Sequence, residues 1–208
     1  TGGAKGVTAE CAVQLARACY PTIILAGRSL EPFVEPEWIR GIVDPSEMKK
    51  QILSHEFPGL KPKPAQIEKQ YQMFLSNREI QTNIDRIKSF GSRVKYFSAD
   101  IQDPIAIDAV FAQVRKEFTH ISAVIHGAGV LEDKLILDKR LDHFNRVFNT
   151  KVEGLDALLE ASKSDPLKYV ILFSSIAART GNVGQCDYAM ANEVLNKTAQ
   201  KLAISRPD

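Results

Sequence analysis

Four short apolar runs, each followed by a stretch with helical periodicity, constrain this chain more than any other feature of its sequence. The runs are Thr22–Ala26, Val94–Ser98, Ile121–Ile125 and Tyr169–Phe173. Runs of this length predict strands, and the last two are apolar enough to predict buried ones. Strands that alternate with helices predict an α/β fold with a doubly wound parallel sheet.

The interval between the first two runs, about residues 30–90, is much longer than a crossover helix needs. Inside it, the capping sequence Asp44-Pro45-Ser46-Glu47 predicts a helix that extends to about His55. A longer helix is expected from about Ala65 to Phe90, where Gly91 ends it. The residues of this helical insertion suggest no chemistry, so we interpret it as structural.

Polar side chains follow the last apolar run. Ser174 and Ser175 come at the carboxyl end of the strand, where open α/β sheets bind their ligands. A helix is expected to begin near Tyr188. Tyr188 and Asn192 are four residues apart and share the face that apolar residues continue. A half-buried tyrosine and a local hydrogen-bonding asparagine would explain this pair alone.

A lysine changes that interpretation. The helix expected from about Asp138 to Lys163 carries an apolar face, and Lys151 lies in the middle of it. Lysine is rarely buried without a partner or a task. An ammonium close to a phenol lowers the pKa of the phenol from about 10 toward working pH, which makes the phenol a usable general acid.

The spacing of these residues resembles the short-chain dehydrogenase/reductase superfamily, which has a Rossmann-like fold. Tyr188 lies thirteen residues after Ser175, Asn192 four further on, and Lys151 twenty-four before the serine. Most of the superfamily has the lysine four after the tyrosine and the asparagine on the preceding helix. Here the two are exchanged, as in the ketoreductase domains of polyketide and polyunsaturated-fatty-acid synthases. The resemblance implies that Lys151, Ser175, Tyr188 and Asn192 are catalytic.

The chain begins with a glycine-rich turn, Thr1-Gly-Gly-Ala-Lys-Gly6-Val-Thr, before a helical run to Cys19. Glycines let the backbone approach a pyrophosphate, and a helix amino terminus supplies N–H donors for it. The turn resembles the superfamily's Thr-Gly-x-x-x-Gly-x-Gly, with Gly2 and Gly6 matching. Thr8 stands where the last glycine is usual, which puts the local packing in doubt more than cofactor binding.

Two cations favour NADPH as the cofactor. Arg28 follows the strand Thr22–Ala26, where an arginine suits a ribose 2′-phosphate, and Lys5 resembles a second basic position of NADP-preferring relatives. The alternative is a pair of surface cations. The sequence His126-Gly-Ala-Gly-Val130 resembles the element on which the nicotinamide half lies; we interpret His126 itself as structural. By resemblance, the cofactor-binding residues are Gly2, Gly3, Lys5, Gly6, Val7, Arg28, Ser29, Asp100, Ile101, Gly127, Ala128, Gly129, Lys151 and Tyr188.

The loop after residue 130 concerns the substrate. In the resembled ketoreductases, a Leu-Asp-Asp at this position accompanies substrate entry from one side of the site and the D-configured 3-hydroxyacyl product. A tryptophan eight residues before the catalytic tyrosine accompanies entry from the other side. Leu131 and Asp133 match, the tryptophan position is Thr180, and Glu132 is interpreted as a solvated charge. With Gln185, Leu131 and Asp133 are the expected substrate residues.

The resemblance therefore implies reduction of a 3-oxoacyl thioester by NADPH within a polyketide or fatty-acid synthase. The expected partners are an acyl carrier protein with phosphopantetheine-bound substrate and other domains of the same polypeptide. Two alternatives stay open: a non-catalytic nucleotide-binding or structural domain of a multienzyme, and a free-standing reductase. Against the second, free-standing members usually keep the unexchanged lysine and asparagine.

Composition excludes other classes of function. With 208 residues, 44% of them hydrophobic, the chain is long enough for one domain, residues 1–208, with a substantial core. A net charge of +2 from scattered basic residues gives no indication of nucleic-acid binding. No apolar run approaches about 20 residues, so we expect no membrane association and a cytoplasmic location. Three cysteines and four histidines lack metal-ligand spacing.

Two strands of the expected sheet are missing from the pattern. A first strand should precede the glycine-rich turn and lie in the middle of the sheet, between Thr22–Ala26 and Ile121–Ile125. A last strand should follow Pro207. We therefore expect these residues to be an internal part of a longer polypeptide.

Overall fold

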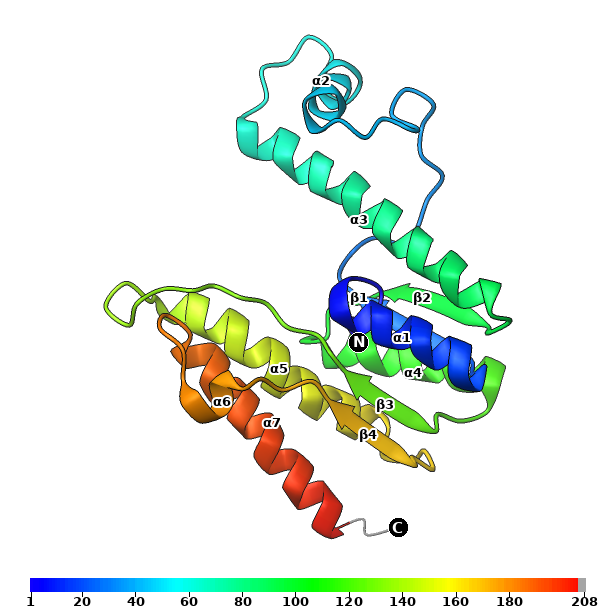
Figure 1. Ribbon diagram of the computed structural model, residues 1–208, viewed down its shortest axis with the longest axis vertical. Helices are drawn as coiled ribbons and strands as arrows, with labels where there is room; N and C mark the ends of the chain where they lie inside the picture. Colours follow the sequence, from blue (N-terminus) through cyan, green and yellow to red (C-terminus); the bar gives the residue numbers. More distant parts are fainter. Residues whose placement is uncertain (206–208) are drawn as a thin grey trace.

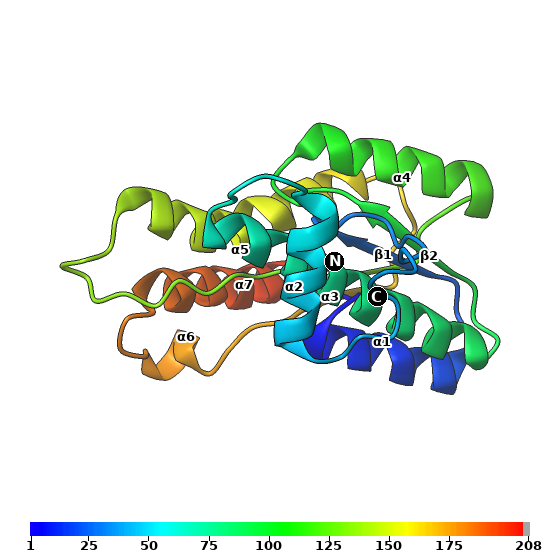
Figure 2. The same ribbon diagram turned by 90° about the horizontal axis from the view of Figure 1, so that it is seen from above.

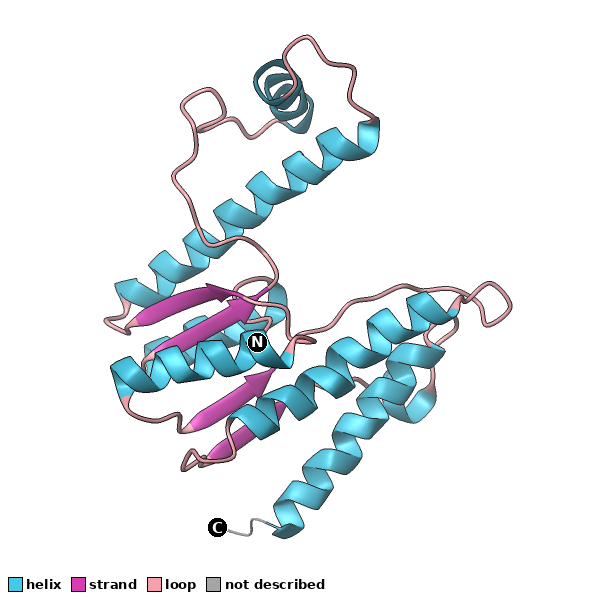
Figure 3. Cartoon of the chain, turned by 180° about the vertical axis from the view of Figure 1, so that it is seen from behind, coloured by secondary structure: helices cyan, strands magenta, loops and turns pink. Residues whose placement is uncertain are grey.

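The computed structural model describes residues 1–205 and shows the predicted alternation of strands and helices. The strands are β1 (Ile23–Gly27), β2 (Val94–Ser98), β3 (Ala123–His126) and β4 (Tyr169–Leu172). β1 pairs in parallel with β2, with Ile23 opposite Val94, and β3 pairs in parallel with β4, with Ala123 opposite Tyr169. Figure 3 shows the two pairs running in one direction on either side of a gap.

The chain's first residues join the two pairs of strands. The Thr1 amino group donates to the Ile125 carbonyl at 2.6 Å, and the Gly2 amide donates to the Ala26 carbonyl at 3.1 Å. Within residues 1–205 no strand lies between β1 and β3, and both pairs of strands are parallel, which confirms the expected parallel α/β fold. The strand expected after Pro207 lies outside the described residues.

Helices cover both faces of the strands. They are α1 (Gly6–Cys19), α2 (Pro45–Glu56), α3 (Pro64–Ser89), α4 (Pro104–Phe118), α5 (Leu141–Ala161), α6 (Ala177–Thr180) and α7 (Cys186–Ser205). α1 and α3 lie on one face, and α4 and α5 lie on the other (Figure 2). α7 packs along α5. Among the helices within residues 1–205, none combines the length and the apolar character that a membrane span requires.

Each face of the strands has its own apolar core. The core under α1 and α3 contains Val13, Ile23, Leu25, Ile80 and Ile87. The core under α4 and α5 contains Ile107, Phe111, Val124 and Leu158. Removing these side chains from water is the main force that holds the helices on the strands.

The helical insertion projects from this body. α3 runs outward from the strands, and α2 lies across its far end (Figure 1). The Asp44 side chain caps α2 by accepting from the Glu47 amide at 2.8 Å, as predicted. The insertion has a third core made of Ile39, Met48, Ile52 and Phe74.

The prediction that Tyr169–Phe173 is a buried strand is wrong for two of its side chains. Tyr169 is 64% exposed and Ile171 is 44% exposed. The two side chains alternate along β4 and so share one face of it, and within residues 1–205 that face is largely uncovered.

Candidate active site

α5, α7 and the end of β4 meet at Lys151. The Lys151 side chain is buried, and its Nζ donates to the Phe173 carbonyl at 2.9 Å. The same nitrogen lies 5.6 Å from the centroid of the Tyr188 ring. Burial lowers the pKa of Lys151 to about 8, because the charged form loses hydration in the interior. The predicted lysine–tyrosine pair is therefore assembled from α5 and α7.

Asn192 lies one helical turn after Tyr188 and is completely buried. Its Nδ2 donates to the Tyr188 carbonyl at 2.8 Å, whereas its Oδ1 has no hydrogen-bond partner within residues 1–205. A buried acceptor without a partner costs free energy. The orphan oxygen, one helical turn after Tyr188, fits a site that receives a further donor.

Ser175 lies in the turn before α6, two residues after Phe173, whose carbonyl accepts from Lys151. Its Oγ accepts from the Ala177 amide at 3.2 Å. The neighbouring Ser174 is directed elsewhere, since its Oγ donates to the Asn192 carbonyl at 3.3 Å. The two serines are thus distinguished by their contacts: Ser174 supports α7, and Ser175 sits in the turn itself.

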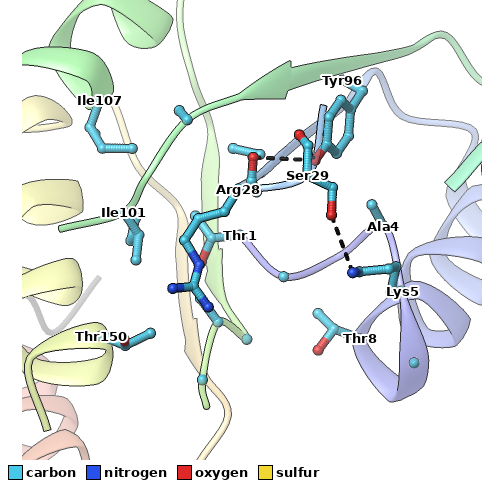
Figure 4. Close-up of a pocket in the computed structure, with 18 residues that line it drawn as sticks. Thr1, Ala4, Lys5, Thr8, Arg28, Ser29, Tyr96, Ile101, Ile107 and Thr150 are labelled. Carbon is cyan, nitrogen blue, oxygen red and sulfur yellow. Dashed lines mark hydrogen bonds between the residues drawn. The ribbon is translucent and has the colours of Figure 1, made fainter. Parts of the chain in front are cut away.

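A cavity of about 390 Å³ opens at the carboxyl ends of β1, β2 and β3 (Figure 4). It is lined by parts of the glycine-rich turn, the end of β1 and residues 127–129. A Cβ on Gly129 would lie 3.2 Å from Lys151 Cε. The lysine therefore packs directly against the backbone of the cavity wall, which joins the cavity to the Lys151–Tyr188 cluster.

Two glycines make close backbone contacts in this wall. Gly2 has a φ of +68°, and a Cβ there would lie 2.8 Å from the Gly127 and Ala128 backbone. A Cβ on Gly127 would lie 2.5 Å from the Thr8 side chain. The threonine that replaces the usual last glycine thus packs on Gly127, which accounts for the departure at Thr8.

Two predicted basic residues line the cavity. Lys5 Nζ donates to Ser29 Oγ at 3.2 Å, whereas the Arg28 side chain extends away from them across the cavity (Figure 4). Tyr96 holds this corner, because its hydroxyl lies 2.8 Å from the Ser29 carbonyl and 3.2 Å from the Gly27 carbonyl. Burial raises the pKa of Tyr96. The sequence analysis missed Tyr96, which carries no motif.

Most of the remaining predicted cofactor residues line the cavity, but three do not. Those in the lining are Gly2, Gly6, Ile101, Gly127, Ala128 and Gly129, and those outside it are Gly3, Val7 and Asp100. The Asp100 side chain is exposed and accepts from the Gln102 amide at 3.0 Å, which is the contact of a turn residue.

The loop that carries the predicted substrate residues lies against the start of α7. Gln185 Nε2 donates to Asp133 Oδ2 at 2.9 Å, and Leu131 is 60% exposed. The interpretation of Glu132 as a solvated charge is wrong. Its carboxylate pairs with Arg146 Nη1 at 2.5 Å and its side chain is 21% exposed, because the loop folds back onto α5.

A buried ion pair that the sequence analysis missed ties this loop to α7. Lys139 Nζ lies 2.7 Å from both carboxylate oxygens of Asp187, and both side chains are almost fully buried. Lys139 also donates to the Glu132 and Gly184 carbonyls. Asp187 Oδ1 accepts from the Tyr188 amide at 2.9 Å. The pair therefore fixes the residue next to the predicted catalytic tyrosine.

His126 is placed as a structural residue. It is fully buried, its Nδ1 lies 2.9 Å from Thr1 Oγ1, and its Nε2 lies 3.0 Å from the Lys151 carbonyl. Burial is the main reason that the pKa of His126 is lowered to about 4, so the ring is neutral at physiological pH. It links β3 to the backbone of Lys151 on α5.

The residues around the cavity suit a nicotinamide dinucleotide. Such a ligand needs a close backbone for its pyrophosphate, cations for further phosphate and a flat surface of small residues for the nicotinamide. Gly2 and Gly127 provide the close backbone. Lys5 and Arg28 provide the cations, and residues 127–129 provide the surface of small residues.

This parallel fold, with its glycine-rich turn, a serine after β4, a lysine on α5 and a tyrosine and asparagine on α7, defines a member of the short-chain dehydrogenase/reductase class of oxidoreductases. More narrowly, the chain belongs to the KR domain family, whose model matches residues 1–205.

Known proteins similar to the chain agree with this family. It is 37% identical over 213 residues to a polyunsaturated fatty acid synthase of Thraustochytrium sp. (strain ATCC 26185 / S-3), an alignment that covers 99% of this chain and 8% of the relative. It shares a TM-score of 0.69 and 27% identity with a ketoreductase domain from the bacillaene assembly line, over 99% of this chain and 39% of that one.

A further solved structure supports the fold alone. A short chain dehydrogenase from Burkholderia cenocepacia J2315 in complex with NADP gives a TM-score of 0.67 at 20% identity, over 98% of this chain and 65% of that one. The chain thus spans a small part of the synthase that it matches and about two thirds of this dehydrogenase.

Proposed function

We propose that the protein uses NADPH to reduce a 3-oxoacyl thioester, presented by the phosphopantetheine of an acyl carrier protein, to the D-3-hydroxyacyl thioester. One observation carries the proposal. Lys151 lies over the Tyr188 ring, Asn192 with its orphan oxygen lies one helical turn after Tyr188, and Gly129 joins the lysine to a cavity lined by Lys5 and Arg28. Membership of the KR domain family implies the same type of reduction.

Each residue of the cluster has a role in this reaction. A nicotinamide cofactor bound in the cavity supplies the hydride for the β-carbon of the ketone. Negative charge then develops on the ketone oxygen, and donors aimed at that oxygen stabilise the transition state. Tyr188 gives the oxygen its proton, and Ser175 donates a hydrogen bond that orients it.

Lys151 and Asn192 support the tyrosine. With the cofactor bound, the Lys151 ammonium would hold its ribose hydroxyls, and its positive charge would stabilise the phenolate that forms when Tyr188 gives up its proton. The Asn192 oxygen, buried and without a partner within residues 1–205, accepts from the lysine or from a water that relays the proton. Lys5, Arg28 and Ser29 would hold the 2′-phosphate of NADPH, and the absence of an acidic partner on either cation within residues 1–205 supports that choice.

The loop of residues 131–133 is the basis for the proposed D configuration of the product. Leu131 and Asp133 match the family's pattern for the D product, and Asp133 is held at the site's edge by Gln185. A substrate that enters from one side presents one face of its ketone to the nicotinamide.

The test compares Tyr188→Phe with Tyr169→Phe, whose ring is exposed on β4. With NADPH and a 3-oxoacyl thioester of N-acetylcysteamine, Tyr188→Phe should lower kcat by about 10²- to 10⁴-fold, because the general acid is lost. Tyr169→Phe should match the wild type. Chiral chromatography of the alcohol should show the D product.

Three results would count against the proposal. Near-full turnover by Tyr188→Phe would remove the tyrosine from its role, and a mainly L product would overturn the inference from the loop. A wild type that binds NADPH but reduces no 3-oxoacyl thioester would favour a non-catalytic nucleotide-binding domain.

A further inference from the structure

One face of α3 reaches the glycine-rich turn from outside. Ser76 Oγ accepts from Lys5 Nζ at 3.1 Å, Glu79 Oε1 accepts from the Gly6 amide at 2.8 Å, and Asn83 Nδ2 donates to the Ala4 carbonyl at 3.0 Å. The three α3 residues are spaced by three and four positions, so they share a helix face. They contact three consecutive residues of the turn.

Ser76 completes the setting of Lys5. The lysine ammonium lies between two hydroxyls, Ser29 at the end of β1 and Ser76 on α3. Both hydroxyls are neutral, and within residues 1–205 Lys5 forms no ion pair. Its position is therefore fixed while its charge stays available to an anion in the cavity.

The other two contacts hold the turn itself. Asn83 is almost fully buried, and its amide satisfies the Ala4 carbonyl. The Glu79 carboxylate accepts from the first amide of α1, where a negative charge is favourable. A turn held at consecutive residues is ordered before any ligand binds, which lowers the entropy lost on binding.

We propose that this face of α3, made of Ser76, Glu79 and Asn83, supports the glycine-rich turn of the cofactor site from behind, and that Ser76 is a positioning residue for selectivity toward a 2′-phosphate through Lys5. The inference rests on the proposed NADPH-dependent function. It assigns the insertion a part in cofactor choice, where the sequence suggested only a structural role.

The experiment measures binding of two adenosine nucleotides by calorimetry. Adenosine 2′,5′-bisphosphate carries the 2′-phosphate, and AMP lacks it. The Kd of AMP divided by the Kd of the bisphosphate therefore measures selectivity for the 2′-phosphate without the nicotinamide half. Ser76→Ala should reduce this ratio about three- to tenfold, as expected for the loss of one hydrogen bond to a charged group. The Kd of AMP should stay near the wild-type value.

Matched variants separate this role from a general effect on the helix. Ser89→Ala removes another serine of α3, whose hydroxyl bonds only the local Arg86 carbonyl, and should leave the ratio unchanged. Ser76→Thr keeps a hydroxyl and should preserve selectivity. Ser76→Val has a side chain of the same size as threonine but no hydroxyl, and it should lose selectivity. Thermal melts check that each variant is folded.

The outcomes distinguish the two proposals. If the wild type prefers the bisphosphate and Ser76→Ala and Ser76→Val prefer it equally, the role of Ser76 is refuted while the cofactor assignment stands. If the wild type shows no preference, the NADPH assignment fails and this inference fails with it.

Discussion

At the scale of single residues, Lys151 combines deep burial with a charge that the proposed reaction needs. Its carbonyl partner, Phe173, is neutral, and no carboxylate pairs with it within residues 1–205. The pKa of Lys151 is lowered from 10.5 to about 8 by loss of hydration. The cofactor-free protein therefore holds this lysine at a cost in stability.

That cost has a defined pH dependence. The unfolded chain keeps the ordinary pKa and binds the proton more tightly than the folded state, so the penalty is full below about pH 8 and shrinks as the pH rises toward 10.5. Lys151→Met should therefore stabilise the protein more at pH 7 than at pH 9. We expect the difference from the wild type in free energy of unfolding to fall by about 1 kcal/mol over that interval.

Urea denaturation at the two pH values measures this change. Lys201→Met on α7, whose side chain is exposed, is the control and should run parallel to the wild type. A Lys151→Met curve parallel to the wild type would show that the lysine is hydrated in the folded protein.

At the scale of elements, the Lys139–Asp187 pair connects the substrate loop to α7. Removing one partner of a buried pair leaves the other charged and unpaired, which typically costs about 3–5 kcal/mol. Lys139→Met and Asp187→Asn should each lower the free energy of unfolding strongly. The double variant should lose clearly less than the sum, because the two changes remove one interaction.

A neighbouring exposed pair is the control. Arg140 and Asp142 form an ion pair with side chains 74% and 53% exposed, and Arg140→Met should destabilise far less. Additive losses for Lys139→Met and Asp187→Asn would mean that the two residues act independently and that the loop is held by other contacts.

Much of the fold was accessible from sequence because its signals are local. β2 matches its predicted span, and α2 begins at the predicted cap, since apolar periodicity and capping residues reflect the burial and hydrogen bonding of neighbouring residues. The lysine–tyrosine pair was identified by its spacing and its resemblance to a family.

The missed features depend on contacts between distant segments. Ser76 and Lys5 are 71 residues apart, and Lys139 and Asp187 are 48 apart. Lys139 is followed by Arg140 in a polar stretch, so nothing local marks it as buried. Such pairs are fixed by how α3 and α7 pack, which no spacing along the chain encodes.

At the scale of the whole molecule, the three apolar clusters described above for residues 1–205 are separate from one another. Two lie on the opposite faces of the strands, and the third lies at the far end of α3 in the insertion (Figure 1). Among the elements of residues 1–205, the long helix α3 alone contributes to both the insertion core and a core of the body, through Phe74 and Ile80. Cores connected in this way need not unfold together.

The single tryptophan makes this testable. Trp38 belongs to the insertion, stacks on His55 at 4.6 Å between ring centroids and lies edge-on to Phe74, so its fluorescence reports the insertion core alone. Far-ultraviolet circular dichroism reports all the helices. Because the insertion core is small, we expect the fluorescence transition in urea to have a lower midpoint than the dichroism transition.

Two core variants identify which unit each transition belongs to. Phe74→Ala removes a large buried side chain from the insertion core and should lower the fluorescence midpoint, while the main dichroism transition changes little. Phe111→Ala removes a large side chain from the core under α4 and α5 and should mainly lower the midpoint of the dichroism transition. Coincident midpoints in the wild type and in both variants would show that α3 couples the insertion to the body and that the protein unfolds as one cooperative unit.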